Sequence, residues 1–227
     1  MTDSTMSTIP TTMTTAEALD AAFSGRSCEL VHSDGRHRPL ATDRWTGAAS
    51  PSDHALFVDR CRGTTLDLGC GPGRLSGALQ DRGVDVLGVD ISSEAVRLTK
   101  ARGAPALCRD AFTDLPGTGS WTHVLLADGN VGLGGRPEHL LRRVAKLLAP
   151  RGTALVELAS AGAVSIHADV HLRVGDRFSG SFDWATVGVE AIDDVAGAAD
   201  LVVTDLVSMA GRHVATLQHR TRARTTR

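Results

Sequence analysis

Three glycines at alternate positions end an apolar run and have the spacing that most directly suggests chemistry. The run 64–68 reads TTLDL and is followed by Gly69, Gly71 and Gly73. Glycine is needed where a tight turn takes a positive φ, or where a ligand approaches the backbone with no Cβ in between. A turn from a strand into a helix also exposes the unpaired N–H groups of the helix start. This loop therefore suits a nucleotide-type ligand.

A carboxylate stands where such a ligand would need one, about 20 residues after the glycines. Asp90 closes the next apolar run, 84–90, and we expect it beside the glycine loop, where it can accept hydrogen bonds from ribose hydroxyls. The dinucleotide fingerprint GxGxxG has its third glycine three residues after the second. Arg74 and Ser76 occupy the two possible positions, so the spacing argues against a nicotinamide dinucleotide.

The run 66–75, LDLGCGPGRL, resembles motif I of the class I S-adenosylmethionine-dependent methyltransferases. Its acidic residue Asp67 lies two positions before the GxGxG, and Asp90 follows at the family's distance. The resemblance covers residues 64 to about 158 and implies S-adenosyl-L-methionine as the cofactor. NAD binding or a vestigial loop is the alternative. The implied cofactor-binding residues are Asp67, Gly69, Cys70, Gly71, Gly73, Asp90, Ile91, Asp110, Ala111, Phe112 and Asp128.

Two further loops are placed by the same resemblance. Asp110 follows the third expected strand and corresponds to the family's adenine-side acid; the alternative is an N-cap of the next helix, and one residue could do both. The loop 128–135, DGNVGLGG, borders the sulfonium and the acceptor in the family. Its four glycines indicate close backbone approach or mobility. It lacks an N-P-P-Y pattern and is similar to small-molecule methyltransferases of high-GC bacteria.

Methyl transfer from a sulfonium requires a nucleophile held in line, about 3 Å away, and a base if the acceptor carries a proton. Asp128 is the first catalytic candidate, through its carboxylate or its backbone carbonyl, and His167 is the candidate base. Alternation predicts that His167, Asp169 and His171 share one side of an extended segment. That spacing also fits a metal site or a solvated polar edge, and we assign no metal. The expected substrate-binding residues are Trp45, Asn130, His171 and Trp184, with ordinary packing as the alternative for both tryptophans.

Composition limits the partners of this chain. The formal net charge is −2 and tyrosine is absent, which argues against nucleic acid or an anionic membrane as a partner. No apolar run is long enough to span a bilayer. The four cysteines are far apart in the sequence, as expected for reduced thiols in the cytoplasm. We expect a small-molecule acceptor as the partner and leave monomer or homodimer open.

The pattern of apolar runs predicts an α/β fold: a Rossmann-like, mostly parallel seven-stranded sheet with helices on both faces and a terminal antiparallel hairpin. Expected strands cover 64–69, 84–90, 105–108, 122–127, 153–158, 201–209 and 212–219, and expected helices cover 17–23, 74–82, 92–103 and 137–148. The expected division is a disordered tail (1–15), an N-terminal lid or helical layer (16–60), the cofactor-binding methyltransferase domain (61–219) and a basic tail (220–227).

These observations predict S-adenosylmethionine-dependent methyl transfer to a small molecule in secondary metabolism, achieved mainly by proximity and orientation. The alternative is a methyltransferase-fold protein that binds the cofactor but has a regulatory or non-methylating role. Motif I, Asp90 and Asp110 are compatible with both.

Overall fold

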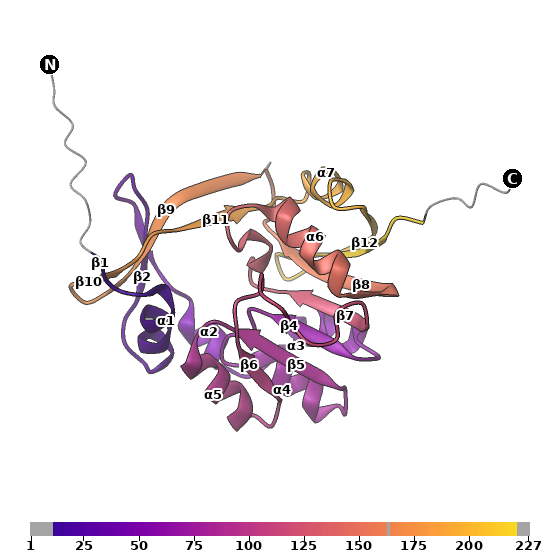
Figure 1. Cartoon of the computed structure of the whole chain (residues 1–227), viewed down its shortest axis with the longest axis horizontal. Coiled ribbons are helices and arrows are strands. Elements are labelled where there is room, and N and C mark those ends of the chain that lie inside the picture. Colours follow the sequence, from indigo (N-terminus) through magenta and orange to yellow (C-terminus); the bar gives the residue numbers. More distant parts are fainter. Residues whose placement is uncertain (1–10, 163, 222–227) are drawn as a thin grey trace, which may run out of the picture.

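Seven strands form the larger of two sheets in the computed structural model, which describes residues 11–162 and 164–221 (Figure 1). The strand order is β12-β13-β8-β7-β4-β5-β6. β4 to β8 run parallel, and β13 runs antiparallel to both of its neighbours. This confirms the predicted fold. The strands are β4 (Thr65–Leu68), β5 (Val86–Asp90), β6 (Ala106–Cys108), β7 (Trp121–Leu126), β8 (Leu148–Leu158), β12 (Leu201–Met209) and β13 (Arg212–His219).

Helices cover both faces of this sheet, because successive strand side chains alternate between two apolar clusters. On one face Leu66 packs with side chains of α6 and α7. On the other face Leu125 packs with side chains of α3, η1 and α4. The elements are α3 (Pro51–Leu56), η1 (Val58–Arg60), α4 (Arg74–Asp81), α5 (Ser93–Ala101), η2 (Asn130–Gly132), α6 (Pro137–Leu147) and α7 (Ile192–Gly197). The described part of the chain contains no helix that could cross a bilayer.

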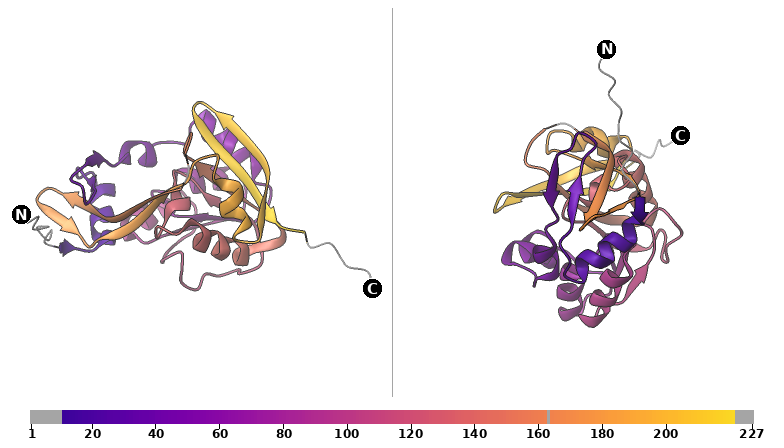
Figure 2. Two further views of the ribbon diagram at one scale, coloured as in Figure 1. Left: turned by 90° about the horizontal axis from the view of Figure 1, so that it is seen from above. Right: turned by 90° about the vertical axis from the view of Figure 1, so that its left-hand side faces the viewer.

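A second sheet lies at one end of the molecule, away from the β12–β13 hairpin (Figure 2). Its order is β1-β10-β9-β2-β3, and β11 also pairs with β9. Helix α1 (Thr15–Phe23) packs on one face of this sheet, against Leu30, Val170 and Leu172. The strands are β1 (Thr11–Met13), β2 (Glu29–Val31), β3 (His37–Pro39), β9 (Ser165–Val174), β10 (Arg177–Ser179) and β11 (Phe182–Thr186). A short helix, α2 (Thr42–Thr46), connects this part of the chain to α3.

The second sheet corrects the expected domain division. Residues 11–13 form β1 and Thr14 caps α1, so an N-terminal tail reaching residue 15 is wrong from residue 11 onward. The boundary at residue 60 is also wrong, because β2 pairs with β9 from the later segment while α3 packs on the larger sheet. Residues 1–10 and all but the first two residues of the expected basic tail lie outside the described residues.

Candidate functional site

The glycine loop after β4 has one position that opens onto free space. Gly69, Gly71 and Gly73 take φ values of 71°, 53° and 80°. A Cβ added at Gly69 would lie 2.5 Å from Asn130 Nδ2, and one at Gly73 would lie 2.7 Å from Thr99 Cα. A Cβ at Gly71 would meet no atom within 4 Å. Packing therefore explains the first and third glycines, whereas Gly71 leaves its backbone accessible to a ligand.

Asp90, at the end of β5, lies directly against this loop. Its Oδ2 accepts a hydrogen bond from the Gly71 amide at 2.9 Å, and its Oδ1 accepts one from the Ser92 amide at 2.9 Å. Burial raises the pKa of Asp90, and the two amides oppose that rise. The carboxylate is thus fixed at the carboxyl edge of the sheet, where ligands bind in open α/β folds.

Asp20 of α1 holds the turn that follows Asp90. Its Oδ1 accepts from Ser92 Oγ at 2.5 Å and from the Glu94 amide at 3.0 Å, and its Oδ2 accepts from Ser93 Oγ at 2.9 Å. Burial raises the pKa of Asp20, but these hydrogen bonds outweigh it and hold the pKa below its usual value. The sequence offered no signal for Asp20 beyond an acidic residue in an expected helix.

Asp67 and Cys70 lie beneath the loop. The Asp67 side chain is buried and its Oδ2 accepts from Ser76 Oγ at 2.7 Å. Burial raises the pKa of Asp67 to about 6. The Cys70 thiol is also buried, 3.7 Å from Thr99 Oγ1. The Asp67 carboxylate and the Cys70 thiol therefore support the loop from below.

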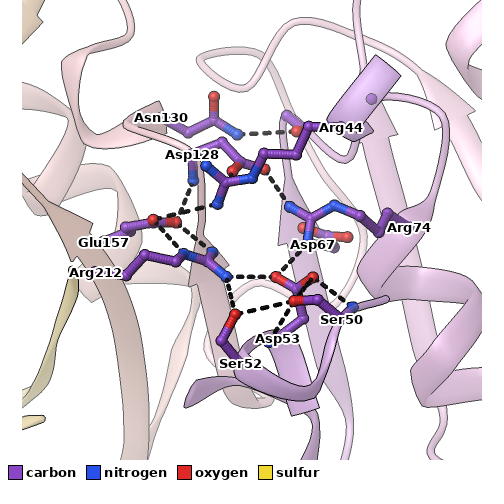
Figure 3. Close-up of polar contacts among 12 residues, drawn as sticks. Arg44, Ser50, Ser52, Asp53, Asp67, Arg74, Asp128, Asn130, Glu157 and Arg212 are labelled. Atoms are coloured by element: carbon purple, nitrogen blue, oxygen red, sulfur yellow. Dashed lines mark hydrogen bonds and ion pairs between the residues drawn. The ribbon is translucent and has the colours of Figure 1, made fainter. Parts of the chain in front are cut away.

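Asp128 follows β7, and its carboxylate lies between two arginines (Figure 3). Its Oδ2 is 2.5 Å from Arg74 Nη2 and its Oδ1 is 2.9 Å from Arg44 Nη2. The Asp128 amide donates to Glu157 Oε2 at 2.7 Å, and the residue takes a φ of 53°. Both oxygens of the Asp128 carboxylate, the first catalytic candidate, are therefore ion-paired.

The same arginines belong to an ion network of six side chains, buried except at Arg44: Arg44, Asp53, Arg74, Asp128, Glu157 and Arg212 (Figure 3). Arg212 of β13 contacts Glu157 at 2.7 Å and Asp53 at 2.6 Å, and Arg74 pairs with Asp53 as well. Burial raises the pKa values of Asp53 and Glu157, but the neighbouring arginines hold both below their usual range. This network joins α2 and α3 to the edge of the sheet.

Asn130 is bound to the glycine loop. Its Nδ2 donates to the carbonyls of Leu68 and Gly69 at 3.0 and 2.8 Å. Asn130 is predicted to contact the substrate, but its side-chain NH2 group donates to the glycine loop. The prediction is corrected for that group. Asn130 thus connects the loop after β4 to the loop after β7.

Strand β11 lies directly on the loop 128–135. A Cβ at Gly132 would lie 1.8 Å from the Ala185 carbonyl oxygen, and one at Gly135 would lie 2.6 Å from Asp183 Cβ. Leu133 forms a bridge with Trp184. Of the two explanations offered for the glycines of this loop, close backbone approach accounts for these two positions.

Trp184 and His167 share one face of the second sheet, above the loop after β7. Trp184 reaches within 4.0 Å of the Cβ position at Gly129, and it pairs across the strands with His167. His167 Nε2 lies 3.2 Å from Thr186 Oγ1, and its ring meets that of His32 edge-on at 5.3 Å. His32 gave no signal in the sequence.

A bulge at Asp169 overturns the expected alternation along β9. Asp169 takes a φ of 51°, and the register shifts so that Val170 pairs with Phe182 while His167 pairs with Trp184. His171 pairs instead with Val31, on the face opposite to α1, and its Nδ1 contacts the Ser179 carbonyl at 2.9 Å. His167 and His171 therefore lie on opposite faces, because one extra residue reverses the side-chain pattern. The prediction that His167 and His171 share one side of this segment is wrong.

Four of the remaining predicted residues follow β5 or β6, and the fifth, Trp45, lies beside α1. Ile91 and Phe112 expose large apolar side chains beside Asp90 and Asp110, and Asp110 Oδ1 accepts from the Phe112 amide at 2.9 Å. Ala111 between them is buried. Trp45 packs edge-on against Phe23 of α1 with ring centroids 6.3 Å apart, which is the ordinary packing alternative.

Two cavities of about 360 and 380 Å³ flank α2. The first is lined by residues of the ion network, including Arg44, Arg74 and Arg212, and the second by the end of α1, α2, Pro72 and Arg102. Neither is lined by Gly71 or Asp90.

Comparisons with known proteins agree with this geometry. Residues 65–152 match the family model described as a methyltransferase domain. A S-adenosylmethionine-dependent methyltransferase from Bacteroides fragilis, solved with S-adenosyl-L-homocysteine, superposes with a TM-score of 0.75 at 19% identity, over 91% of this chain and 94% of that chain. The 1,6-didemethyltoxoflavin-N1-methyltransferase of Burkholderia thailandensis, solved with 1,6-didemethyltoxoflavin and S-adenosylhomocysteine, gives 0.59 at 19% identity over 91% and 89%. A sugar N-methyltransferase of a Streptoalloteichus species gives 0.53 at 16% identity over 70% and 80%. At these identities the superpositions show a shared fold.

Proposed function

We propose that this chain transfers the methyl group of S-adenosylmethionine to a small-molecule acceptor, because residues 65–152 match a methyltransferase domain and the fold is shared with S-adenosylmethionine-dependent methyltransferases. The observation that carries the proposal is the open space at Gly71 beside the fixed carboxylate of Asp90. A protein side chain fills the corresponding space at Gly69 and at Gly73, so Gly71 is the glycine of this loop whose missing Cβ serves a ligand.

The cofactor fits the groups around this space. In this proposal Asp90 accepts hydrogen bonds from the ribose hydroxyls, and Asp110 accepts one from the adenine amine. The exposed side chains of Ile91 and Phe112 are apolar surfaces suited to the adenine ring. Asp67, Cys70, Gly69 and Gly73 support the loop from below or by packing. The bound cofactor supplies a methyl group activated by a sulfonium.

The acceptor is proposed to lie beside Gly129, at the start of the loop 128–135, next to Trp184 and His167 of the second sheet. Trp184 forms an apolar wall there, next to Gly129. The bound cofactor would supply the activated methyl group, and an acceptor that carries a proton would release it on methylation. His167 accepts that proton at Nδ1, since its Nε2 contacts Thr186. Asp128 holds the shape of its loop through the two arginines.

Activity on a compound of secondary metabolism is part of the proposal. Relatives of the same fold include enzymes named for toxoflavin and sugar N-methylation. The alternative, a cofactor-binding protein without methyl transfer, is favoured by one observation: the carboxylate at the expected catalytic position is fully ion-paired.

Methyl-labelled S-adenosylmethionine and a panel of amino sugars, heteroaromatic amines and phenols test the proposal. We expect S-adenosylhomocysteine binding by calorimetry and transfer of label to a member of the panel. Binding of S-adenosylhomocysteine without transfer to any of these classes would support the non-methylating alternative. Absence of binding would contradict both.

A further inference from the structure

Asp20 lies outside the glycine loop, the strand ends and the acceptor face, yet its carboxylate is bonded to the turn that holds Asp90. Ser92 is the shared residue: its Oγ donates to Asp20 Oδ1 at 2.5 Å, and its amide donates to Asp90 Oδ1 at 2.9 Å. The Ser92 side chain is fully buried. The two carboxylates are therefore connected through Ser92, whose buried hydroxyl donates to Asp20.

We propose that Asp20 is a positioning residue of the cofactor site, which couples occupancy of that site to the docking of α1 and of the second sheet. The inference rests on the proposed function, because it assumes that Asp90 binds the cofactor. It goes beyond that function by giving a residue of α1 a role in cofactor affinity.

The chemistry of the turn explains why Asp20 matters. Ser92 is the N-cap of α5, and its Oγ accepts from the Ala95 amide while donating to Asp20. Asp20 Oδ1 also accepts from the Glu94 amide, an orphan donor of the first helical turn. A carboxylate at this position is favoured by the helix dipole as well. Without it, the Glu94 amide and the Ser92 hydroxyl lose their acceptor, and the turn that presents the Ser92 amide to Asp90 is held less firmly.

The same carboxylate fastens α1. Among the described residues, every hydrogen bond between α1 and α5 is accepted by Asp20. Helix α1 in turn carries the second sheet, through its apolar contacts with Leu30, Val170 and Leu172. Binding energies of coupled sites are reciprocal. If docking of α1 through Asp20 favours the conformation of Asp90 that binds the cofactor, then a bound cofactor must favour the docked position of α1.

Calorimetric titration with S-adenosylhomocysteine tests the first half of this coupling. Asp20→Ala should weaken affinity about tenfold, as expected for loss of hydrogen bonds to a charged group. Asp20→Asn keeps an oxygen for Ser92 and Glu94, so it should restore most of the affinity. Leu19→Ala is the matched control: it removes apolar packing from the same helix and should lower Tm but leave the affinity unchanged, because Leu19 packs against the apolar cluster of the second sheet.

Hydrogen exchange tests the second half with a readout that does not depend on catalysis. S-adenosylhomocysteine should slow exchange of the amides of α1 (Thr15–Phe23) in the wild type and in Leu19→Ala, but not in Asp20→Ala. If Asp20→Ala fails to fold, the wild-type experiment alone decides. Wild-type binding with no protection of α1, or equal affinity for Asp20→Ala and wild type, would overturn the inference. Absence of wild-type binding would instead defeat the proposed function.

Discussion

The backbone amide of Gly71 donates to the carboxylate of Asp90 at 2.9 Å, so the one open glycine of the loop and the acid of the next strand form a single unit. The contact joins two parallel neighbours, β4 and β5, at their carboxyl ends. A ligand that reaches the Gly71 backbone must therefore also meet Asp90.

Asp90→Ala should weaken S-adenosylhomocysteine binding by about ten- to a hundredfold, because hydrogen bonds to a charged group contribute roughly 1.5–3 kcal/mol. The variant also removes the acceptor of the Gly71 and Ser92 amides, so circular dichroism should first establish that it is folded. Calorimetry giving an unchanged affinity would rule out Asp90 as a cofactor residue.

Gly71→Val should abolish binding, and Gly83→Val is a matched control. Both glycines have a positive φ, 53° and 71°, and neither has an atom within 4 Å of an added Cβ. Backbone strain should therefore cost both variants a similar stability, on the order of 1–2 kcal/mol. Only Gly71→Val places its side chain in the proposed cofactor space. Equal affinities of the two variants for S-adenosylhomocysteine would contradict that placement.

Asp67 should give the stability of the protein a distinctive pH dependence. Its pKa is raised from 3.8 to about 6 by burial, so the folded state binds the proton more tightly than the unfolded state. The contribution of Asp67 to the free energy of unfolding is on the order of 2–3 kcal/mol. It is complete below pH 3.8 and is lost as pH rises through about 6. Asp67→Asn has no such titration. Urea unfolding between pH 4 and 7 should show the wild type losing stability relative to the variant as pH rises. The same pH dependence of the unfolding free energy in both proteins would refute the raised pKa of Asp67.

Removing the Arg74 side chain from the ion network should lower the stability of the protein. This side chain is buried, and removing it leaves Asp53 and Asp128 with less compensation for their charges. Arg74→Ala should cost about 3–5 kcal/mol, as for other broken buried pairs. Arg82, just past the other end of α4, forms an exposed pair with Asp59 at 2.8 Å. Arg82→Ala should leave the unfolding midpoint in urea unchanged, and similar losses for both variants would contradict the network's role.

The larger sheet could be predicted because apolar runs alternate with helical patterns along most of its sequence. The strand 84–90 and the helix capped at Ser92 have local signals, and the structure contains both as β5 and α5. The glycine loop and Asp90 were predictable for the same reason, since a strand, a turn and a helix follow one another within the motif.

The second sheet and the ion network have no comparable signal. β2 and β3 are three residues long, and β2 gains its place by pairing with β9 about 140 positions later. Nothing in the sequence marks Asp169 as the bulge that separates His167 from His171. The network combines side chains from distant elements, such as Asp53 and Arg212, so only the folded chain brings them together.

The most direct test of the account is a calorimetric titration of the wild-type protein with S-adenosylhomocysteine and, separately, with NAD. The open Gly71 and the absence of a third dinucleotide glycine predict saturable binding of S-adenosylhomocysteine and none of NAD. Tight binding of NAD with no detectable binding of S-adenosylhomocysteine would contradict the account.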